Sequence, residues 1–417
     1  MSDEIRDLLE EAARRARQET DDEPEPGMAG DVAWPMQVSL GKGLEGAIAT
    51  STQIGYVNGA KGWLIYRGYN VFDLAIHSTY EETAYLLLYG SLPSRRQLAD
   101  FSRLLLHQRP VPPTVFDVLG MIPTARTHPM AALRTAVSVL GTLDESAEKL
   151  TVADETDVAV KLIAQFATLT GAIARIRHGR EPLAPRDDLG HAANLLYLMT
   201  GEEPDPLMAR IMDIGLILHA DHGMNASTFT TMVVNSSLAD MYSSVVAGIG
   251  SLKGPLHGGA NEQVLYDLED IQRPENVEPW LDRAQASKRK VNGFGHRVYK
   301  AYDPRARILG PLAELLSRRD LATRNLYQIA VALDELMTSR LGKEKKIFPN
   351  VDFYSGIVYK AMAIEPGMFT PIFAVSRVAG WCARALEYLG DNRIFRPRAI
   401  YTGPPRMEYQ PLDQRSV

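Results

Sequence analysis

The stretch VNGFGHRVYKAYDPRAR, from Val291 to Arg307, combines a loop, a helix start and a cluster of charges. Glycine adopts backbone angles that other residues resist, so Gly293 and Gly295 predict that His296 lies on a tight loop. A titratable imidazole beside fixed positive charge suits a small anionic substrate whose carbonyl oxygen needs a proton or a hydrogen bond. The cationic side chains that follow His296 are Arg297, Lys300, Arg305 and Arg307.

The end of this stretch predicts the start of a helix. Asp303 is typical of a turn, and Pro304 is typical of the first helical position. The alternative interpretation is a surface turn with solvated basic residues, which we favour for Lys300 or Arg307 taken alone. For the whole stretch we favour the functional interpretation, because three comparable segments occur nearby in the sequence.

The composition is that of an ordinary globular protein. The chain has 417 residues, of which 45% are hydrophobic and 23% charged, enough for two or three domains or one large helical domain with an appendage. A net charge of -6 argues against nucleic acid as the main partner. The single cysteine, Cys382, excludes an intrachain disulfide and favours a reducing, cytoplasmic location.

The sequence also argues against a membrane partner. No apolar run is expected to be long enough to span a bilayer, and the N-terminus is charged from its third residue, unlike a secretory signal.

Periodicity predicts a mainly α fold with a small β element near the N-terminus. Residues 1–19 have helical spacing, but with the acidic Pro/Gly linker that follows we expect residues 1–35 to be a mobile segment. Residues 36–69 favour short strands and turns. No βαβ alternation and no fixed repeat occurs. Helical spacing is found at 79–90 (with Thr79 and Glu82 as a capping box), 131–141, 156–177, 187–200, 206–218, 239–250, 306–341 and 371–389.

A second constellation is HADHGMNASTFT, residues 219–230. His219 and His222 are three apart at the end of an apolar helix, so they could share one face and bind a metal. Against this, the sequence has no HExxH motif and no cysteine cluster, and we expect Gly223 to end the helix just after His222. A polar contact is the better interpretation for His222. Asn225 and its neighbours Ser227 and Thr228 are typical of the cap of the next helix.

Two further loops carry candidate acid–base groups. His257 lies in GPLHGGANE between glycines that let a ligand approach the backbone closely, and a helix is expected to begin at Asn261. Asp352 in IFPNVDFYSG follows an apolar run, so burial could raise its pKa and make it a general base. The alternative is that Asp352 only caps the helix that follows.

Two arginines complete the candidates. Arg377 lies in the apolar run FAVSRVAGW, and a buried arginine needs an anionic partner. Arg396 follows in RIFRPRAIYTG. Together with Arg305 they could clamp a di- or tricarboxylate, because guanidinium binds carboxylate through two parallel hydrogen bonds.

These segments together resemble the citrate synthase family. HADHGMNAST, GPLHGGANE, GFGHRVYKAYDPR, PNVDFYSG and RPRAIYTG occur in the family's order, and the resemblance extends from about Gly43 onward. It implies a large helical domain of residues 36–257 and 366–417, a small helical domain of residues 258–365, and a homodimer with shared active sites. It also implies that acetyl-CoA is a co-substrate and that neither a cofactor nor a metal is required.

The resemblance implies a role for each candidate. His257 would hydrogen-bond the thioester carbonyl, Asp352 would take a proton from the acetyl methyl group, and His296 would polarise the keto group of oxaloacetate. His222, Arg305, Arg377 and Arg396 would contact oxaloacetate or citrate. The coenzyme A contacts would be Lys300, Arg297, Gly293, Gly295 and Asn350.

The implied reaction is the condensation of acetyl-CoA, oxaloacetate and water to citrate and CoA, the step by which acetyl groups join the tricarboxylic acid cycle. 2-Methylcitrate synthases, which use propionyl-CoA, share these residues and remain an alternative. A metal-dependent hydrolase built on His219, Asp221, His222 and His257 is a remote one. The intact His257, His296 and Asp352 argue against a helical binding protein without catalysis.

Overall fold

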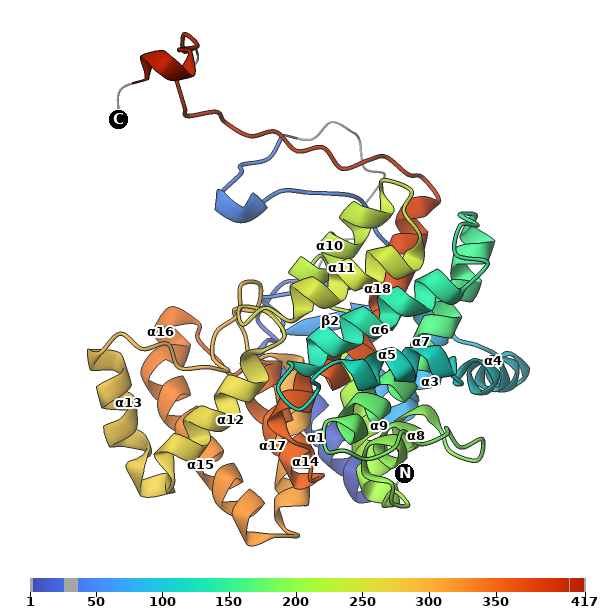
Figure 1. The fold of residues 1–417 in the computed structure, drawn as a ribbon. Helices are drawn as coiled ribbons and strands as arrows, with labels where there is room; N and C mark the ends of the chain where they lie inside the picture. The colour runs from blue at the N-terminus through green and yellow to red at the C-terminus, as the bar shows by residue number, and fades with distance from the viewer. Residues whose placement is uncertain (1–2, 26–36, 405, 416–417) are drawn as a thin grey trace.

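The computed structural model describes residues 3–25, 37–404 and 406–415. Helices make up most of the molecule (Figure 1), so the predicted mainly α class is confirmed. The predicted β element is also confirmed, as a small antiparallel sheet in the order β1–β2–β3. Its strands are β1 (Gly55–Asn58), β2 (Trp63–Tyr66) and β3 (Tyr69–Asn70).

The turn between β1 and β2 holds the loop that carries His296. The carbonyl oxygen of Gly59 accepts hydrogen bonds from the backbone N–H of Lys300 at 2.9 Å and of Ala301 at 3.2 Å. A Cβ atom at Gly59 would lie 2.1 Å from the carbonyl oxygen of Val298, so only glycine fits there. The turn of the sheet therefore fixes the backbone of Lys300 and Ala301, just after the loop that carries His296.

The N-terminal helix α1 (Asp3–Glu19) is confirmed, but the expectation of a mobile segment is corrected for these residues. Ile5 and Leu9 are fully buried, and α1 packs against α2 (Val71–His77) and α14 (Pro304–Ser317). Burying such an apolar face ties the helix to the body of the protein. Most of the expected linker, residues 26–36, lies outside the described part of the chain.

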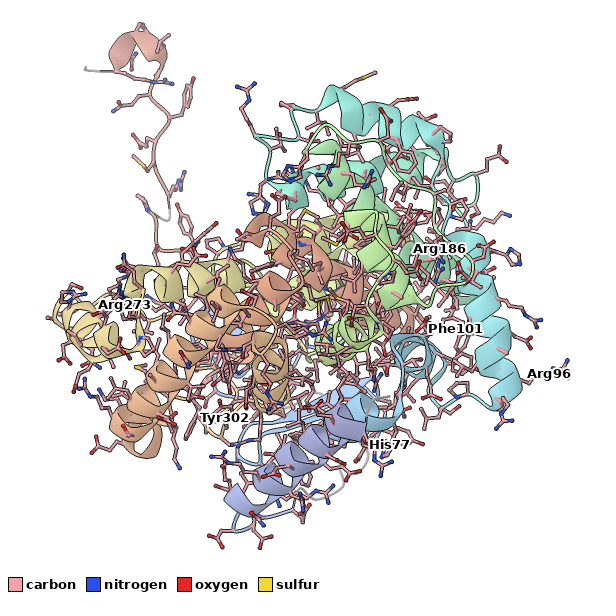
Figure 2. The ribbon with its side chains drawn as sticks, turned by 90° about the horizontal axis from the view of Figure 1, so that it is seen from below. His77, Arg96, Phe101, Arg186, Arg273 and Tyr302 are labelled. Carbon is pink, nitrogen blue, oxygen red and sulfur yellow. The ribbon has the colours of Figure 1, made fainter. Side chains whose placement is uncertain are left out.

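Most of the remaining helices before residue 258 form one bundle. The helix α3 (Tyr80–Tyr89) begins and ends as predicted: the Thr79 side chain accepts from the N–H of Glu82, and Gly90 ends the helix in the left-handed conformation. In Figure 2, Arg96 projects outward from α4, whereas Phe101 on the same helix is buried. The other helices here are α4 (Arg95–Gln108), α5 (Pro113–Met121), α6 (Pro129–Leu143), α8 (His191–Thr200), α9 (Pro206–His219), α10 (Ala226–Asn235) and α11 (Met241–Leu252).

Two long helices form the centre of this bundle. The helices α7 (Val152–Ile176) and α18 (Phe369–Leu389) pack against each other and are buried along most of their length. By length and composition α7 could cross a membrane, so the expectation that no run is long enough is corrected. However, 89% of its apolar window is buried inside the molecule, as in the core helix of a soluble protein.

A second group of helices follows residue 258 and packs mainly on itself (Figure 1, yellow to orange). The helical character predicted for residues 306–341 is confirmed, but the stretch is divided, because Asp320 caps a new helix by accepting from the N–H groups of Ala322 and Thr323. The proposed domain boundaries stay a prediction. The helices are α12 (Ala260–Ile271), α13 (Val277–Ala286), α14, α15 (Leu321–Met337), α16 (Lys343–Lys345) and α17 (Val351–Ala361).

The chain after α18 leaves the body as an extended arm (Figure 1). Its large apolar side chains are mostly exposed, with Ile400 at 93% and Tyr409 at 83%. Short single turns complete the structure: 3-10 helices at Lys42–Leu44, Pro274–Asn276, Pro366–Met368 and Leu412–Gln414, and a π-helical turn at Thr338–Gly342.

Candidate active site

The tight loop predicted around His296 is confirmed. Gly293 and Gly295 both have φ of +78°, in the left-handed region that favours glycine. The side-chain amide of Asn350 donates to the carbonyl oxygen of Gly295 at 3.0 Å. The N–H of Gly295 donates to the carbonyl oxygen of Phe348 at 2.9 Å. These bonds hold the histidine loop against the segment that leads into α17.

Two backbone donors determine the tautomer that we assign to His296. Its Nδ1 accepts from the N–H of Val298 at 3.0 Å and of Tyr299 at 3.1 Å. Burial lowers its pKa to about 4, with Arg305 and Lys300 adding to the effect and Asp303 opposing it. At neutral pH the ring is therefore neutral, and its proton is on Nε2, where it can donate to a ligand.

His222 lies close to His296, but not on a helix. The expectation that Gly223 ends the helix is wrong, because α9 ends at His219, so His219 and His222 share no helical face. The ring centroids of His222 and His296 are 5.2 Å apart, and Nε2 of His222 lies 3.2 Å from the hydroxyl oxygen of Tyr299. Burial, followed by the charge of Arg305, lowers the pKa of His222 well below its usual value.

The remaining residues proposed for a metal site have other partners. Both carboxylate oxygens of Asp221 accept from Arg384, at 2.8 and 2.7 Å, in a buried ion pair. His219 donates from Nδ1 to the carbonyl oxygen of Gly215 at 2.7 Å. Among the described residues, no group of three or more His, Cys, Asp or Glu side chains is arranged to hold a metal ion. This geometry does not support the metal-dependent hydrolase.

His257 is held by residues at the start of α10. Its Nε2 accepts from the N–H of Ser227 at 3.3 Å, and the hydroxyl group of Ser227, 2.8 Å away, is itself bound by the indole N–H of Trp381. Asn225 Oδ1, 3.2 Å from Nε2, already accepts from Ser227 and Thr228. We therefore assign the proton to Nδ1, the opposite tautomer to that of His296. Burial, then the charge of Arg377, lowers the pKa of His257 to about 4.

Asp352 lies in the first turn of α17, but it does not cap that helix. The cap is Asn350, whose side chain accepts from the N–H of Asp352 at 3.0 Å. One carboxylate oxygen of Asp352 is buried and has no hydrogen-bond partner among the described residues. Burial raises its pKa to about 7, against the charges of Arg305 and Arg377. A carboxylate with that pKa suits a general base near neutral pH.

Two buried arginines supply the positive charge. The guanidinium of Arg305 binds both oxygens of Asp303, at 3.0 and 2.7 Å. Arg377 on α18 donates to the carbonyl oxygen of His219 at 2.6 Å, while its Nη2 has no partner among the described residues. Burial lowers the pKa of Arg377 to about 10, which means that the surroundings disfavour its charge. An anionic ligand would supply the missing partner.

One predicted site residue, Arg396, is not brought together with the others within a single chain. Arg396 lies on the exposed arm after α18 and makes no hydrogen bond or ion pair with the residues that the structure describes. The side chains of Arg297 and Lys300 are exposed. Two partners could not be recognised from the sequence, Ser227 for His257 and Tyr299 for His222. No spacing rule could have found the first, because 30 residues separate Ser227 from His257.

Comparison with known proteins agrees with the resemblance that the sequence motifs indicate. A family model described as "Citrate synthase, C-terminal domain" matches residues 43–398. The citrate synthase of Deinococcus radiodurans is 45% identical over 377 residues, which cover 90% of this chain and 99% of the relative. The 2-methylcitrate synthase of Shewanella oneidensis is 40% identical over 376 residues, covering 90% and 98%.

Solved structures agree with the sequence comparison. The crystal structure of citrate synthase from Pyrobaculum aerophilum has a TM-score of 0.85 and 43% identity, covering 93% of this chain and 100% of that one. The ternary complex of citrate synthase from Thermoplasma acidophilum with carboxymethyl coenzyme A and oxaloacetate has a TM-score of 0.87 and 34% identity, covering 91% of this chain and 100% of that one.

The hydrogen bonds predict opposite tautomers for two histidines of the free protein. At pH 7 we expect His257 to be neutral with its proton on Nδ1, and His296 to be neutral with its proton on Nε2. Nitrogen-15 NMR of the imidazole rings distinguishes these states, and His257→Gln and His296→Gln variants would assign the signals. Matching tautomers, or a charged ring at either position, would contradict the geometry.

Proposed function

The chain belongs to the citrate synthase family, and we propose that His257, Asp352 and His296 are the groups that act on its substrates. The enzyme is an acyltransferase that joins the acetyl group of acetyl-CoA to oxaloacetate. The observation that carries the assignment of roles is the buried, unpartnered oxygen of Asp352, whose carboxyl has a pKa of about 7. Neutral histidine donors and buried arginines accompany it.

The first step is removal of a proton from the acetyl methyl group. A thioester methyl is a very weak carbon acid, so the carboxylate of Asp352 needs help from a group that stabilises the product. The Nδ1–H of His257 would donate to the thioester oxygen, where negative charge develops as the C–H bond breaks. Because burial keeps this ring neutral, His257 acts as a hydrogen-bond donor and remains uncharged before the reaction.

The second step forms the carbon–carbon bond. The enolate carbon attacks the keto carbon of oxaloacetate, and the Nε2–H of His296 would donate to the oxygen that becomes the alkoxide. This oxygen ends as the hydroxyl group of citryl-CoA, which balances the proton that Asp352 removed from the methyl group. Arg305 and Arg377 would hold the two carboxylates, which places one reactant beside the other. Water then cleaves the thioester C–S bond, which releases citrate and CoA.

The coenzyme A contacts divide into two kinds. Lys300 and Arg297 are exposed cations beside the site and suit the phosphates of coenzyme A. A Cβ atom at Gly295 would meet nothing within 4 Å, so this side of the loop is open to a ligand. In contrast, Asn350 caps α17 and holds Gly295, and Gly293 packs on Phe353, so both would act by shaping the loop.

The homodimer with shared sites is also part of the proposal. The exposed apolar side chains of the C-terminal arm need a surface to cover them, and a second copy of the chain would provide it. Arg396 lies at the start of this arm, after α18, without a partner among the described residues. We infer that it completes the oxaloacetate site of the other subunit. A cytoplasmic location, where the buried Cys382 stays reduced, completes the proposal.

Oxaloacetate-dependent thiol release from acetyl-CoA tests the proposed reaction and the role of Asp352. The kcat/KM for oxaloacetate should rise with pH through about 7, since the base must be ionised, and level off above it. Asp352→Asn should still bind oxaloacetate but lose turnover by orders of magnitude.

Propionyl-CoA should be the poorer substrate. We expect its kcat/KM to be lower than that of acetyl-CoA by the equivalent of about 1–3 kcal/mol, the usual effect of one extra methylene in a pocket.

Near-normal turnover in Asp352→Asn would refute its role as the base. A clear preference for propionyl-CoA would make the enzyme a 2-methylcitrate synthase.

Subunit complementation tests whether Arg396 serves the partner. Arg396→Ala and His257→Ala should each be nearly inactive as homodimers. In a heterodimer of the two, one site carries both defects and the other carries neither, so activity should return to about half the wild-type rate per dimer. Purified heterodimers as inactive as both parents would show that Arg396 serves its own subunit.

A further inference from the structure

The helix α1 lies outside residues 43–398, the part of the chain that matches the family model. Relatives that align over 99% of their own length leave about a tenth of this chain unmatched, because the alignment covers 90% of it. Yet α1 packs directly on α14, the helix that carries Arg305, and on α2. The contacts between α1 and α14 therefore need an explanation of their own.

The last residue of α1 neutralises a buried charge on α14. The carboxylate of Glu19 forms an ion pair with the guanidinium of Arg307, whose side chain is 8% exposed. The same guanidinium lies 4.3 Å from the ring centroid of Tyr302. Burial lowers the pKa of Arg307, and the charge of Glu19 opposes that shift. Without Glu19, a guanidinium that is largely buried would lose this counter-ion.

The position of Arg307 is linked to that of Arg305 by helix geometry. Residues two apart in an α-helix point about 200° apart, on opposite sides. Arg305 is directed toward the histidines: its guanidinium carbon lies 5.9 Å from the ring centroid of Tyr299, which lies 5.5 Å from that of His222 and 4.7 Å from that of His296. Arg307 is directed toward α1. The pair with Glu19 thus fixes the first turn of α14 from the side away from the site.

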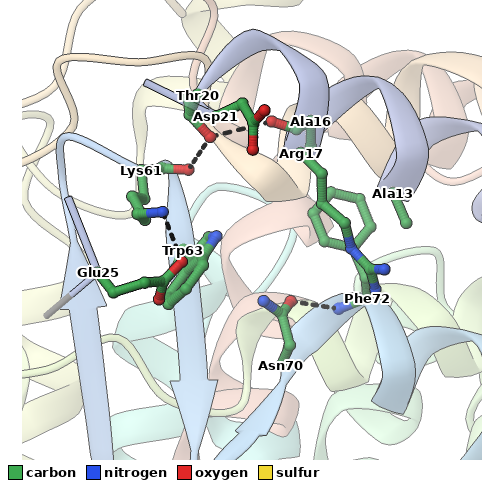
Figure 3. Close-up of a pocket in the computed structure, with 10 residues that line it drawn as sticks. All are labelled: Ala13, Ala16, Arg17, Thr20, Asp21, Glu25, Lys61, Trp63, Asn70 and Phe72. Carbon is green, nitrogen blue, oxygen red and sulfur yellow. Dashed lines mark hydrogen bonds and ion pairs between the residues drawn. The ribbon is translucent and has the colours of Figure 1, made fainter. Parts of the chain in front are cut away.

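The residue that follows α1 is bonded to the β1–β2 turn, which also holds the loop that carries His296. The hydroxyl group of Thr20 donates to the carbonyl oxygen of Lys61 in the β1–β2 turn at 3.3 Å. That turn binds the backbone of Lys300 through Gly59. Figure 3 shows the cavity, of about 320 Å³, that lies between the end of α1 and this turn, with the Lys61–Glu25 ion pair at one side of it. The end of α1 therefore contacts two elements that hold residues 291–307: the first turn of α14, through Arg307, and the β1–β2 turn, through Lys61.

We propose that Glu19 is a positioning residue for oxaloacetate, acting through Arg307 on Arg305. The inference rests on the proposed function of Arg305 as an oxaloacetate contact. A role in stability alone would lower the melting temperature of a Glu19 variant and leave substrate affinity unchanged. A positioning role instead weakens oxaloacetate binding in protein that is fully folded.

Glu19→Gln tests this with an isosteric, neutral side chain. We expect the Kd for oxaloacetate, measured by calorimetry, and its KM to rise about tenfold, because small displacements of a binding group are costly. The KM for acetyl-CoA should change less than twofold. Glu4→Gln is the matched control: Glu4 lies on the same helix and pairs with Arg318 at 3.0 Å, but both side chains are about half exposed. It should leave oxaloacetate binding unchanged.

A double-mutant cycle tests the route through Arg307. Arg307→Gln should also weaken oxaloacetate binding, and adding Glu19→Gln to it should change Kd by less than twofold. The double variant buries no unpaired cation, so it gives the answer even if Glu19→Gln alone does not fold. A Kd within twofold of wild type in Glu19→Gln or in the double variant, or additive effects of the two changes, would overturn the proposal.

Measuring oxaloacetate binding and turnover separately distinguishes a failure of the proposed reaction from a failure of the proposed role of Glu19. Wild-type protein that binds oxaloacetate without releasing thiol from acetyl-CoA would refute the proposed function, and the cycle of Kd values would still decide the role of Glu19.

Discussion

The buried carboxylate of Asp303 connects the parts of the site that must keep a fixed arrangement. It caps α14 by accepting from the N–H of Arg305 at 3.0 Å, and it binds the guanidinium of the same residue. It also accepts from the N–H of Val351 at 3.2 Å, at the start of α17. One side chain thus joins the helix that carries Arg305 to the helix that carries Asp352. The loop with His296 precedes Asp303 and is held by other bonds, from Asn350 to Gly295 and from Lys300 to Gly59.

This arrangement explains the electrostatics of the site. Burial keeps His257 and His296 neutral and raises the pKa of Asp352 to about 7. Arg305 has Asp303 as its counter-ion, whereas Arg377 has a buried Nη2 without a partner among the described residues. Burying such a charge costs stability unless a ligand neutralises it. The site is therefore arranged for an anion, at a cost to the fold that binding would remove.

Features that depend only on residues close together in the sequence could be predicted. The N-cap at Thr79, the helix start at Asp303 and Pro304 and the glycine loop at His296 all depend on contacts within four residues, and all are confirmed. Of the predicted capping box, the structure shows the bond from the N–H of Glu82 to the Thr79 side chain. The end of α9 was predicted too late, at Gly223 in place of His219. The turn that follows is held by a distant residue, Tyr66, whose hydroxyl group donates to the carbonyl oxygen of Asp221 at 2.9 Å. The junction between α14 and α15 was not predicted, because apolar spacing continues across it.

Contacts between distant segments could not be predicted. Asp352 and Asn350 are equally good candidates for a cap by residue type, and only the structure shows that Asn350 takes this role and leaves Asp352 for chemistry. The pair of Glu19 and Arg307 spans 288 positions, and no local pattern indicates it. The central claim is that Arg377 is retained for an anionic substrate. Arg377→Met tests it most directly, by calorimetry with oxaloacetate and thermal unfolding without ligand. We expect binding to weaken by about 2–5 kcal/mol, which is at least thirtyfold in Kd, with no fall in melting temperature. Oxaloacetate affinity within threefold of wild type would contradict it.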